Sequence, residues 1–164
     1  MNVRVSVLEA EENLVERAVD ELENAFPFLN FEVGREYANI ERAYDKSRGQ
    51  YLASKIVRIC AEGSFKVVVT SVDLYENPLN FVFGLAIPIL RTAVVSYYRL
   101  MGKNLLLRLE KEIMHELGHL FGLDHCMNRC VMRFSNSVYE VDLKPLGFCE
   151  KCHSSLLTFL ENFP

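Results

Sequence analysis

The chain has 164 residues, which is enough for one domain of ordinary size and too few for two independent cores. Half of the residues are hydrophobic and 24% are charged, which excludes a disordered tail or a collagen-like fibre and predicts a globular protein. The 18 basic and 22 acidic residues give a net charge of −4 and are scattered along the chain, which argues against nucleic-acid binding.

The first half of the sequence predicts strands alternating with helices. Valines alternate with polar residues over 2–8, as in a strand with one buried face, and apolar residues recur every four positions over 14–26, as in an amphipathic helix. A second strand is expected over 28–33 and a second helix over 52–60. The nearly continuous β-branched run 65–72 predicts a central strand that is covered on both faces.

The second half continues with two strands and a long helix. Segment 81–89 is strand-like, but Pro88 has no N–H to give to a neighbouring strand, which favours an edge position. Another strand is expected over 93–100. From Asn104, a candidate N-cap, apolar residues step by three and four until Gly122, where the helix should end.

Four of the five cysteines and all four histidines lie between residues 115 and 153, so we expect the chemistry there. The first ten residues lack the apolar core of a secretory signal, and the longest apolar stretch, 81–90, is too short to span a bilayer. We therefore expect a cytoplasmic protein without a membrane segment, whose reduced cysteines hold metal or do redox work.

The predicted long helix carries the pattern HExxH as His115, Glu116 and His119. Residues four apart on a helix share one face, so two imidazoles can reach one zinc ion with a glutamate close by. Gly122 can take the left-handed conformation that turns the chain and brings His125 to the metal. An isolated HExxH is also compatible with an ordinary exposed helix turn, but the added glycine and third histidine make that interpretation rare.

Three nitrogen ligands leave one coordination position open, which favours a catalytic zinc over a structural one. A water bound there becomes acidic enough to act as a nucleophile near neutral pH. Glu116 would accept its proton and pass it to the leaving amine while zinc polarises the scissile carbonyl. The pattern therefore predicts metal-assisted amide hydrolysis.

The long motif with a methionine shortly downstream resembles the metzincin zinc peptidases. Met132, two residues after Cys130, matches their Met-turn, and the resemblance implies that it lies beneath the zinc without binding it. A cysteine directly after the third histidine and a late CxxC are similar to the archaemetzincin family. Weaker similarity over 48–51, 81–88 and 134–137 extends the resemblance to most of the chain. It implies a zinc metallopeptidase acting on peptides, with aminopeptidase-like activity in some members.

Two close cysteine pairs follow the third histidine. Pairs spaced in this way are the usual arrangement for a tetrahedral zinc held by four thiolates, which is structural because all four positions are filled. The four residues are Cys126, Cys130, Cys149 and Cys152. Three residues separate the first pair, against four in the archaemetzincin pattern, which affects the loop geometry and not the ligand count. We therefore expect two zinc ions per chain, one catalytic and one structural.

Other interpretations of the cysteines stay open. Residues 149–153 also match the CxxCH pattern of haem attachment, although attachment requires export and leaves the first pair unexplained. A redox CxxC pair would follow a thioredoxin-like strand, which the sequence does not predict. Disulfides would require an oxidising compartment. His153 could replace Cys152 as a ligand.

The expected fold is α/β (α+β metzincin-like): a twisted mixed sheet with backing helices and a zinc-binding active-site helix, plus a small irregular C-terminal subdomain tied by zinc. We expect one metallopeptidase domain over 1–164, with an upper subdomain 1–125 and a four-cysteine subdomain 126–164 that ends in a short helix. Because His125 and Cys126 are adjacent, the two metals would lie within about 14 Å. The sulfur-bound zinc should therefore anchor the third histidine.

The predicted edge strand supplies the substrate hypothesis. Free backbone groups of Phe83, Gly84 and Leu85 could bind an extended peptide as an added strand, although an ordinary edge protected by its proline is equally compatible. The leading function is peptide hydrolysis by a monomeric enzyme. A zinc-stabilised peptide-binding module with little turnover is the alternative, and Glu116→Gln distinguishes the two.

Overall fold

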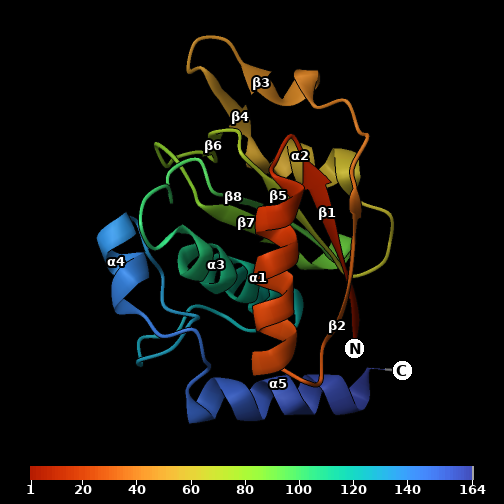
Figure 1. Ribbon diagram of the computed structural model, residues 1–164, viewed down its shortest axis with the longest axis vertical. Helices are drawn as coiled ribbons and strands as arrows, with labels where there is room; N and C mark the ends of the chain where they lie inside the picture. The colour runs from red at the N-terminus through yellow and green to blue at the C-terminus, as the bar shows by residue number, and fades with distance from the viewer. Residues whose placement is uncertain (164) are drawn as a thin grey trace.

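The computed structural model describes residues 1–163 and shows a five-stranded mixed sheet flanked by helices (Figure 1). In sheet order the strands are β2 (Asn30–Arg35), β1 (Asn2–Leu8), β5 (Lys66–Thr70), β8 (Thr92–Ser96) and β7 (Gly84–Ile87). The first four run parallel, and β7 pairs antiparallel with β8. The mixed sheet is therefore confirmed, and β7 forms one edge as its proline predicts.

The central strands differ in how well the sequence pattern describes them. All five residues of β5 are buried, as its β-branched run predicts. In β1 the alternation holds only at the start, and every residue from Val5 onward is buried, Ser6 included. The expectation of one exposed face is wrong there, because both faces of its second half are covered: Val7 lies in one hydrophobic core and Leu8 in the other.

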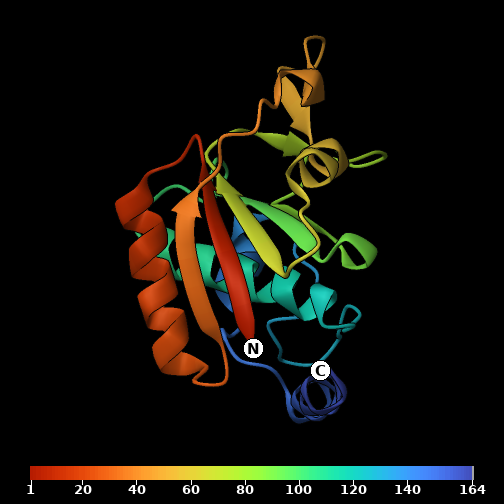
Figure 2. The same cartoon turned by 90° about the vertical axis from the view of Figure 1, so that its right-hand side faces the viewer.

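Helices cover both faces of the sheet. The helices α1 (Glu12–Ala25) and α3 (Leu105–Leu120) pack on one face, with Val67 in their core. The helix α2 (Ala53–Cys60) packs on the other face, with Val68 in its core. Successive strand residues point to opposite faces, so one strand feeds both cores. Figure 2 shows α1 and α2 on opposite sides of the sheet.

A second, three-stranded sheet lies beyond α2 and is not predicted by the sequence (Figure 1). It contains β3 (Tyr44–Asp45), β4 (Gln50–Leu52) and β6 (Leu74–Tyr75). Strands of two or three residues are too short to show alternation. There are also two 3₁₀ turns, at Glu41–Ala43 and Pro88–Leu90.

The long helix begins and ends where the sequence predicts. Asn104 occupies the N-cap position of α3, although its side chain makes no capping hydrogen bond. Gly122 has a φ of 84°, the left-handed conformation that ends the helix and turns the chain. No helix within residues 1–163 is both long and apolar enough to cross a membrane.

The last part of the chain has more helix than expected. A six-residue helix, α4 (Val138–Leu143), precedes α5 (Glu150–Asn162), which has 13 residues in place of the short helix predicted. The aromatic side chains of α5 explain its length. Phe159 packs on Phe65 and Phe121, so the helix is held against the rest of the molecule along its second half.

Candidate active site

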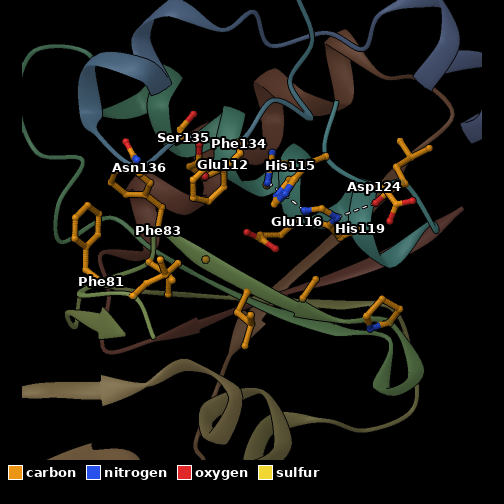
Figure 3. A pocket seen from close by; sticks show the side chains of 18 of the residues that line it. Phe81, Phe83, Glu112, His115, Glu116, His119, Asp124, Phe134, Ser135 and Asn136 are labelled. Atoms are coloured by element: carbon orange, nitrogen blue, oxygen red, sulfur yellow. Dashed lines mark hydrogen bonds between the residues drawn. The ribbon is translucent and has the colours of Figure 1, made fainter. Parts of the chain in front are cut away.

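A cavity of about 710 Å³ lies between β7 and α3 (Figure 3). The edge strand and the residues before it form one wall, and the carboxyl-terminal half of α3 forms the other. Segment 134–136 closes part of the rim. Three imidazoles and Glu116 line the middle of the cavity, so the residues of the long sequence motif face a space that could admit a peptide.

The three histidines converge on one point. Nε2 of His115 lies 3.2 Å from Nε2 of His119, and all three histidines offer a nitrogen within 4.8 Å of the others. Two nitrogens bound at 2.0–2.1 Å to one tetrahedral zinc would be about 3.3 Å apart. The turn at Gly122 brings His125 to the other two, and the spacing fits one zinc ion.

Hydrogen bonds fix which imidazole nitrogen carries the proton. Nδ1 of His115 donates to the carbonyl of Val131, and Nδ1 of His119 donates to the carbonyl of Leu123, each at 2.8 Å. A carbonyl oxygen can only accept, so the proton is on Nδ1 and the Nε2 lone pairs face one another. Facing lone pairs repel unless a cation lies between them, which supports a metal at this point.

The electrostatic surroundings keep the imidazoles neutral, which is the form that binds zinc. Burial lowers the pKa of His115 well below its ordinary value, and the positive charge of Lys144 lowers it further. Burial also lowers the pKa values of His119 and His125. The three nitrogens are therefore prepared to accept a divalent ion without first losing a proton.

Glu116 is buried beside this cluster and points toward β7 (Figure 3). Burial raises the pKa of its carboxyl group well above the ordinary value, and the nearby Glu112 adds to the effect. A Cβ atom at Gly84 would lie 2.7 Å from Oε1 of Glu116 and 2.8 Å from the carbonyl oxygen of Val94. The glycine therefore provides the space in which the carboxylate stands against the edge strand.

Met132 packs against α3 at Gly118. Its side chain is fully buried, and it lies so close to Gly118 that a Cβ atom there would overlap the methionine sulfur. Gly118 lies on α3 between the two helical histidines. The contact explains why the position carries a glycine in the middle of a helix, where alanine would otherwise be preferred.

The four cysteines of the two pairs form a second cluster, with every Sγ atom within 4.8 Å of the others. Sγ of Cys126 lies 3.7 Å from Sγ of Cys149, close to the roughly 3.8 Å expected for two thiolates on one tetrahedral zinc. All five cysteines are free thiols, so the disulfide interpretation is wrong. His153 is exposed and lies outside the cluster, so Cys152 is not replaced.

Cys149 occupies the N-cap of α5, where backbone N–H groups point outward. A hydrogen bond from the backbone of Cys152 lowers the pKa of the Cys149 thiol to about 6, and the side chain of Asn128 lowers it further. The thiolate is the form that binds zinc. The start of α5 therefore prepares one ligand of the cluster.

Comparison with known proteins decides the family. The sequence model of peptidase family M54 matches residues 13–158. The chain belongs to this family, the archaemetzincins. It is therefore a zinc metallopeptidase of the metzincin type, as the long histidine motif, the methionine and the late cysteines predict.

Individual archaemetzincins agree with this assignment. The chain is 49% identical to archaemetzincin from Pyrobaculum aerophilum over 125 residues, which is 74% of this chain and 81% of that protein. The crystal structure of archaemetzincin from Archaeoglobus fulgidus, complexed with malonate, superposes with a TM-score of 0.87 at 36% identity and covers 94% of this chain and 99% of that one. The crystal structure of archaemetzincin from Methanopyrus kandleri superposes with a TM-score of 0.87 at 37% identity and covers 99% of this chain and 96% of that one. The expected fold class is confirmed.

The structure brings together the residues that the archaemetzincin pattern singles out, and it adds several that the pattern misses. Phe83, Gly84 and Leu85 line the cavity opposite the imidazoles. The carbonyl oxygens that orient the histidines were not expected, because backbone acceptors leave no mark in a sequence. Glu112 and Lys144 were also missed: they form a buried ion pair beside the cavity but lie far apart in the chain.

Proposed function

We propose that this archaemetzincin hydrolyses peptide bonds at a zinc ion held by His115, His119 and His125, with Glu116 as the general base. The observation that carries the proposal is the pair of Nε2 lone pairs facing each other at 3.2 Å in a cavity open to substrate. Bound there, zinc would supply a water acidic enough to attack at neutral pH and would polarise the scissile carbonyl.

The chain's own residues then move the proton. Glu116 accepts it from the attacking water on a carboxylate oxygen and later donates it to the departing nitrogen. The buried position of Glu116 raises its affinity for the proton, which suits a group that must hold it between the two steps. Gly84 leaves the space that the carboxylate occupies, because any side chain at this position would collide with it. Met132 supports the helix from below.

The second part of the proposal is a structural zinc held by Cys126, Cys130, Cys149 and Cys152. Three of the four residues are buried, and four thiolates would fill the tetrahedral coordination of a zinc ion, which leaves no open position for substrate. With two zinc ions per chain, residues 1–164 form one domain in which 126–164 is a small subdomain tied by the second zinc. The free thiols fit a reducing cytoplasm, and one chain supplies every residue of the site, which fits a monomer.

The substrate in this proposal is an extended peptide that adds to the free edge of β7 through Phe83, Gly84 and Leu85. Aminopeptidase-like action would require an acid near the free amino group, and Asp124 lines the cavity beyond the histidines. Comparing peptides with free and acetylated amino termini tests this preference. Loss of cleavage on acetylation supports trimming from the amino terminus, and equal cleavage identifies an endopeptidase.

Glu116→Gln tests the enzyme against the alternative, a peptide-binding module. We expect the variant to keep two zinc ions per chain by mass spectrometry and to lose about 10²- to 10⁴-fold in kcat on a peptide library. Glu161→Gln, an exposed change on α5, is the matched control and should cleave like the wild type. Peptide binding by a zinc-loaded wild type that cleaves nothing would favour the binding module.

A further inference from the structure

A buried ion pair forms part of the cavity wall. Glu112 lies one helical turn before Glu116 on α3, and its Oε1 is 2.8 Å from Nζ of Lys144. The two side chains are 4% and 1% exposed. A buried ion pair often stabilises a protein no better than apolar residues of similar size, because both charges lose their hydration. Stability alone therefore does not explain why an ion pair is buried at this position.

The carboxylate lies between its partner and the substrate. Glu112 lines the cavity that holds the histidines, whereas Lys144 lines a second cavity of about 470 Å³ on the other side of segment 134–136. Lys144 also donates a long hydrogen bond to the carbonyl of Arg133, which keeps it on that side. A substrate group entering the active-site cavity would therefore meet the negative partner first.

The carboxylate has unused capacity for hydrogen bonds. Its contact with Lys144 is an ion pair, and Oε1 has no hydrogen-bond partner of good geometry. Oε2 accepts no hydrogen bond from residues 1–163 either, although an ionised carboxylate can accept about four. The buried hydroxyl oxygen of Ser135, on the same cavity wall, also lacks a partner. Two residues that line the same cavity therefore have side-chain oxygens without a hydrogen-bond donor in the part of the chain that the structure describes.

The charges around the cavity favour a cationic donor. Among the described residues, three acids line it and neither lysine nor arginine does; the acids are Glu112, Glu116 and Asp124. The rings of Phe83 and Phe134 lie at the same end of the cavity as Glu112 (Figure 3). Such walls suit a side chain with an apolar stem and a charged tip, as in lysine and arginine.

The course of the edge strand tells which substrate residue reaches Glu112. Strand β7 follows directly after Phe83, at the Glu112 end, and runs toward the end marked by Asp124 (Figure 3). A peptide added antiparallel to β7 passes the histidines from the Asp124 end to the Glu112 end. The residue that follows the scissile bond would then lie at Glu112.

We propose that Glu112 is a specificity-determining residue that binds a lysine or arginine side chain immediately after the scissile bond. The ammonium or guanidinium group donates to the free carboxylate oxygen and to Ser135, while its stem packs between Phe83 and Phe134. Lys144 holds the carboxylate at the wall from behind. The inference rests on the proposed peptidase function and names the substrate class of the same cavity.

The test uses the zinc-loaded full chain and peptides that differ only in lysine or norleucine after the scissile bond. A hydrogen bond between charged groups makes kcat/KM about tenfold or more higher for lysine in the wild type. Glu112→Gln should bring the ratio near one, whereas Glu161→Gln keeps the wild-type ratio. Glu112→Gln leaves Lys144 buried and unpaired, which could prevent folding. In that case the double variant Glu112→Gln/Lys144→Met replaces it, and its kcat/KM ratio should also be near one.

A binding measurement separates this inference from the proposed function. Zinc-loaded Glu116→Gln, titrated calorimetrically with the same peptides, should bind the lysine peptide about tenfold more tightly than the norleucine peptide. If the variant shows this preference but the zinc-loaded wild type cleaves neither peptide, the proposed hydrolysis is contradicted and the role of Glu112 is retained. Equal affinities and rates for the two peptides, or a preference for norleucine, would overturn the role of Glu112 alone.

Discussion

The histidine cluster and the cysteine cluster hold their ligands in different ways. Two of the three histidines lie on α3, a 16-residue helix packed in the main core, and backbone carbonyls orient both. The cysteines come from two loops and the first turn of α5, and they lie mostly buried. The fold itself arranges the site that faces the cavity. The closed site, in contrast, depends on its own metal to hold the chain together.

Removing ligands from the four-cysteine site should have the largest effect on stability and zinc binding. Cys149→Ser/Cys152→Ser takes away two of the four thiolates, and we expect one zinc ion per chain and a loss of at least about 3 kcal/mol in unfolding free energy. The affinity for the remaining zinc should fall roughly tenfold or more, because His125 loses its anchored neighbour. Zinc counts by mass spectrometry and chelator competition measure both effects.

Cys60→Ala is the control for that experiment, since Cys60 is a buried thiol of the α2 core outside both clusters. It should keep two zinc ions and the wild-type affinity. A folded double serine variant that binds its remaining zinc as tightly as the wild type would show that the two sites are independent.

Disturbing the support beneath the histidines should have the next largest effect. Gly118→Ala places a methyl group against the Met132 sulfur, so either that side chain or α3 must move. We expect a loss of about 1–3 kcal/mol in unfolding free energy, measured by chemical denaturation, together with weaker zinc binding. At Gly147 an added Cβ meets nothing within 4 Å, so Gly147→Ala is the matched control. Equal stability of the two variants would contradict the tight contact.

A smaller change tests the wall opposite the histidines. Gly84→Ala would bring a methyl group within 2.8 Å of the Glu116 side chain and the Val94 carbonyl, displacing the carboxylate. We expect kcat to fall about tenfold to a hundredfold with both zinc ions retained, because a misplaced base transfers protons poorly. Gly34→Ala, where the nearest atom is 3.8 Å away, should leave kcat unchanged. Full activity of Gly84→Ala would show that the position of the Glu116 carboxylate does not depend on a glycine here.

The smallest effect concerns the helix that carries the histidines. Burial raises the pKa of Glu110 to about 7, Glu21 of α1 adds to the shift, and Lys111 opposes it. Between about pH 4.5 and pH 7 the unfolded chain loses this proton before the folded chain does, so stability falls as pH rises. Glu110→Gln should therefore gain about 1–2 kcal/mol in unfolding free energy at pH 8 and almost nothing at pH 4.5. A gain that does not depend on pH would contradict this assignment.

The sequence predicts those features that repeat or match a spacing. Alternation and β-branched runs identify β1 and β5, and the histidine spacing identifies the active-site helix with the correct ends. Features made by distant contacts leave no such pattern. The ion pair of Glu112 and Lys144 exists only because α4 brings its end against α3, and the small sheet has strands too short for periodicity.

Three consecutive residues reach both clusters. Cys130 belongs to the thiol group, the Val131 carbonyl orients His115, and Met132 packs beneath the helix. Because the three contacts come from consecutive residues, a substitution that shifts the backbone here would move all three together. The geometry of this short stretch therefore links the catalytic centre mechanically to the thiol cluster.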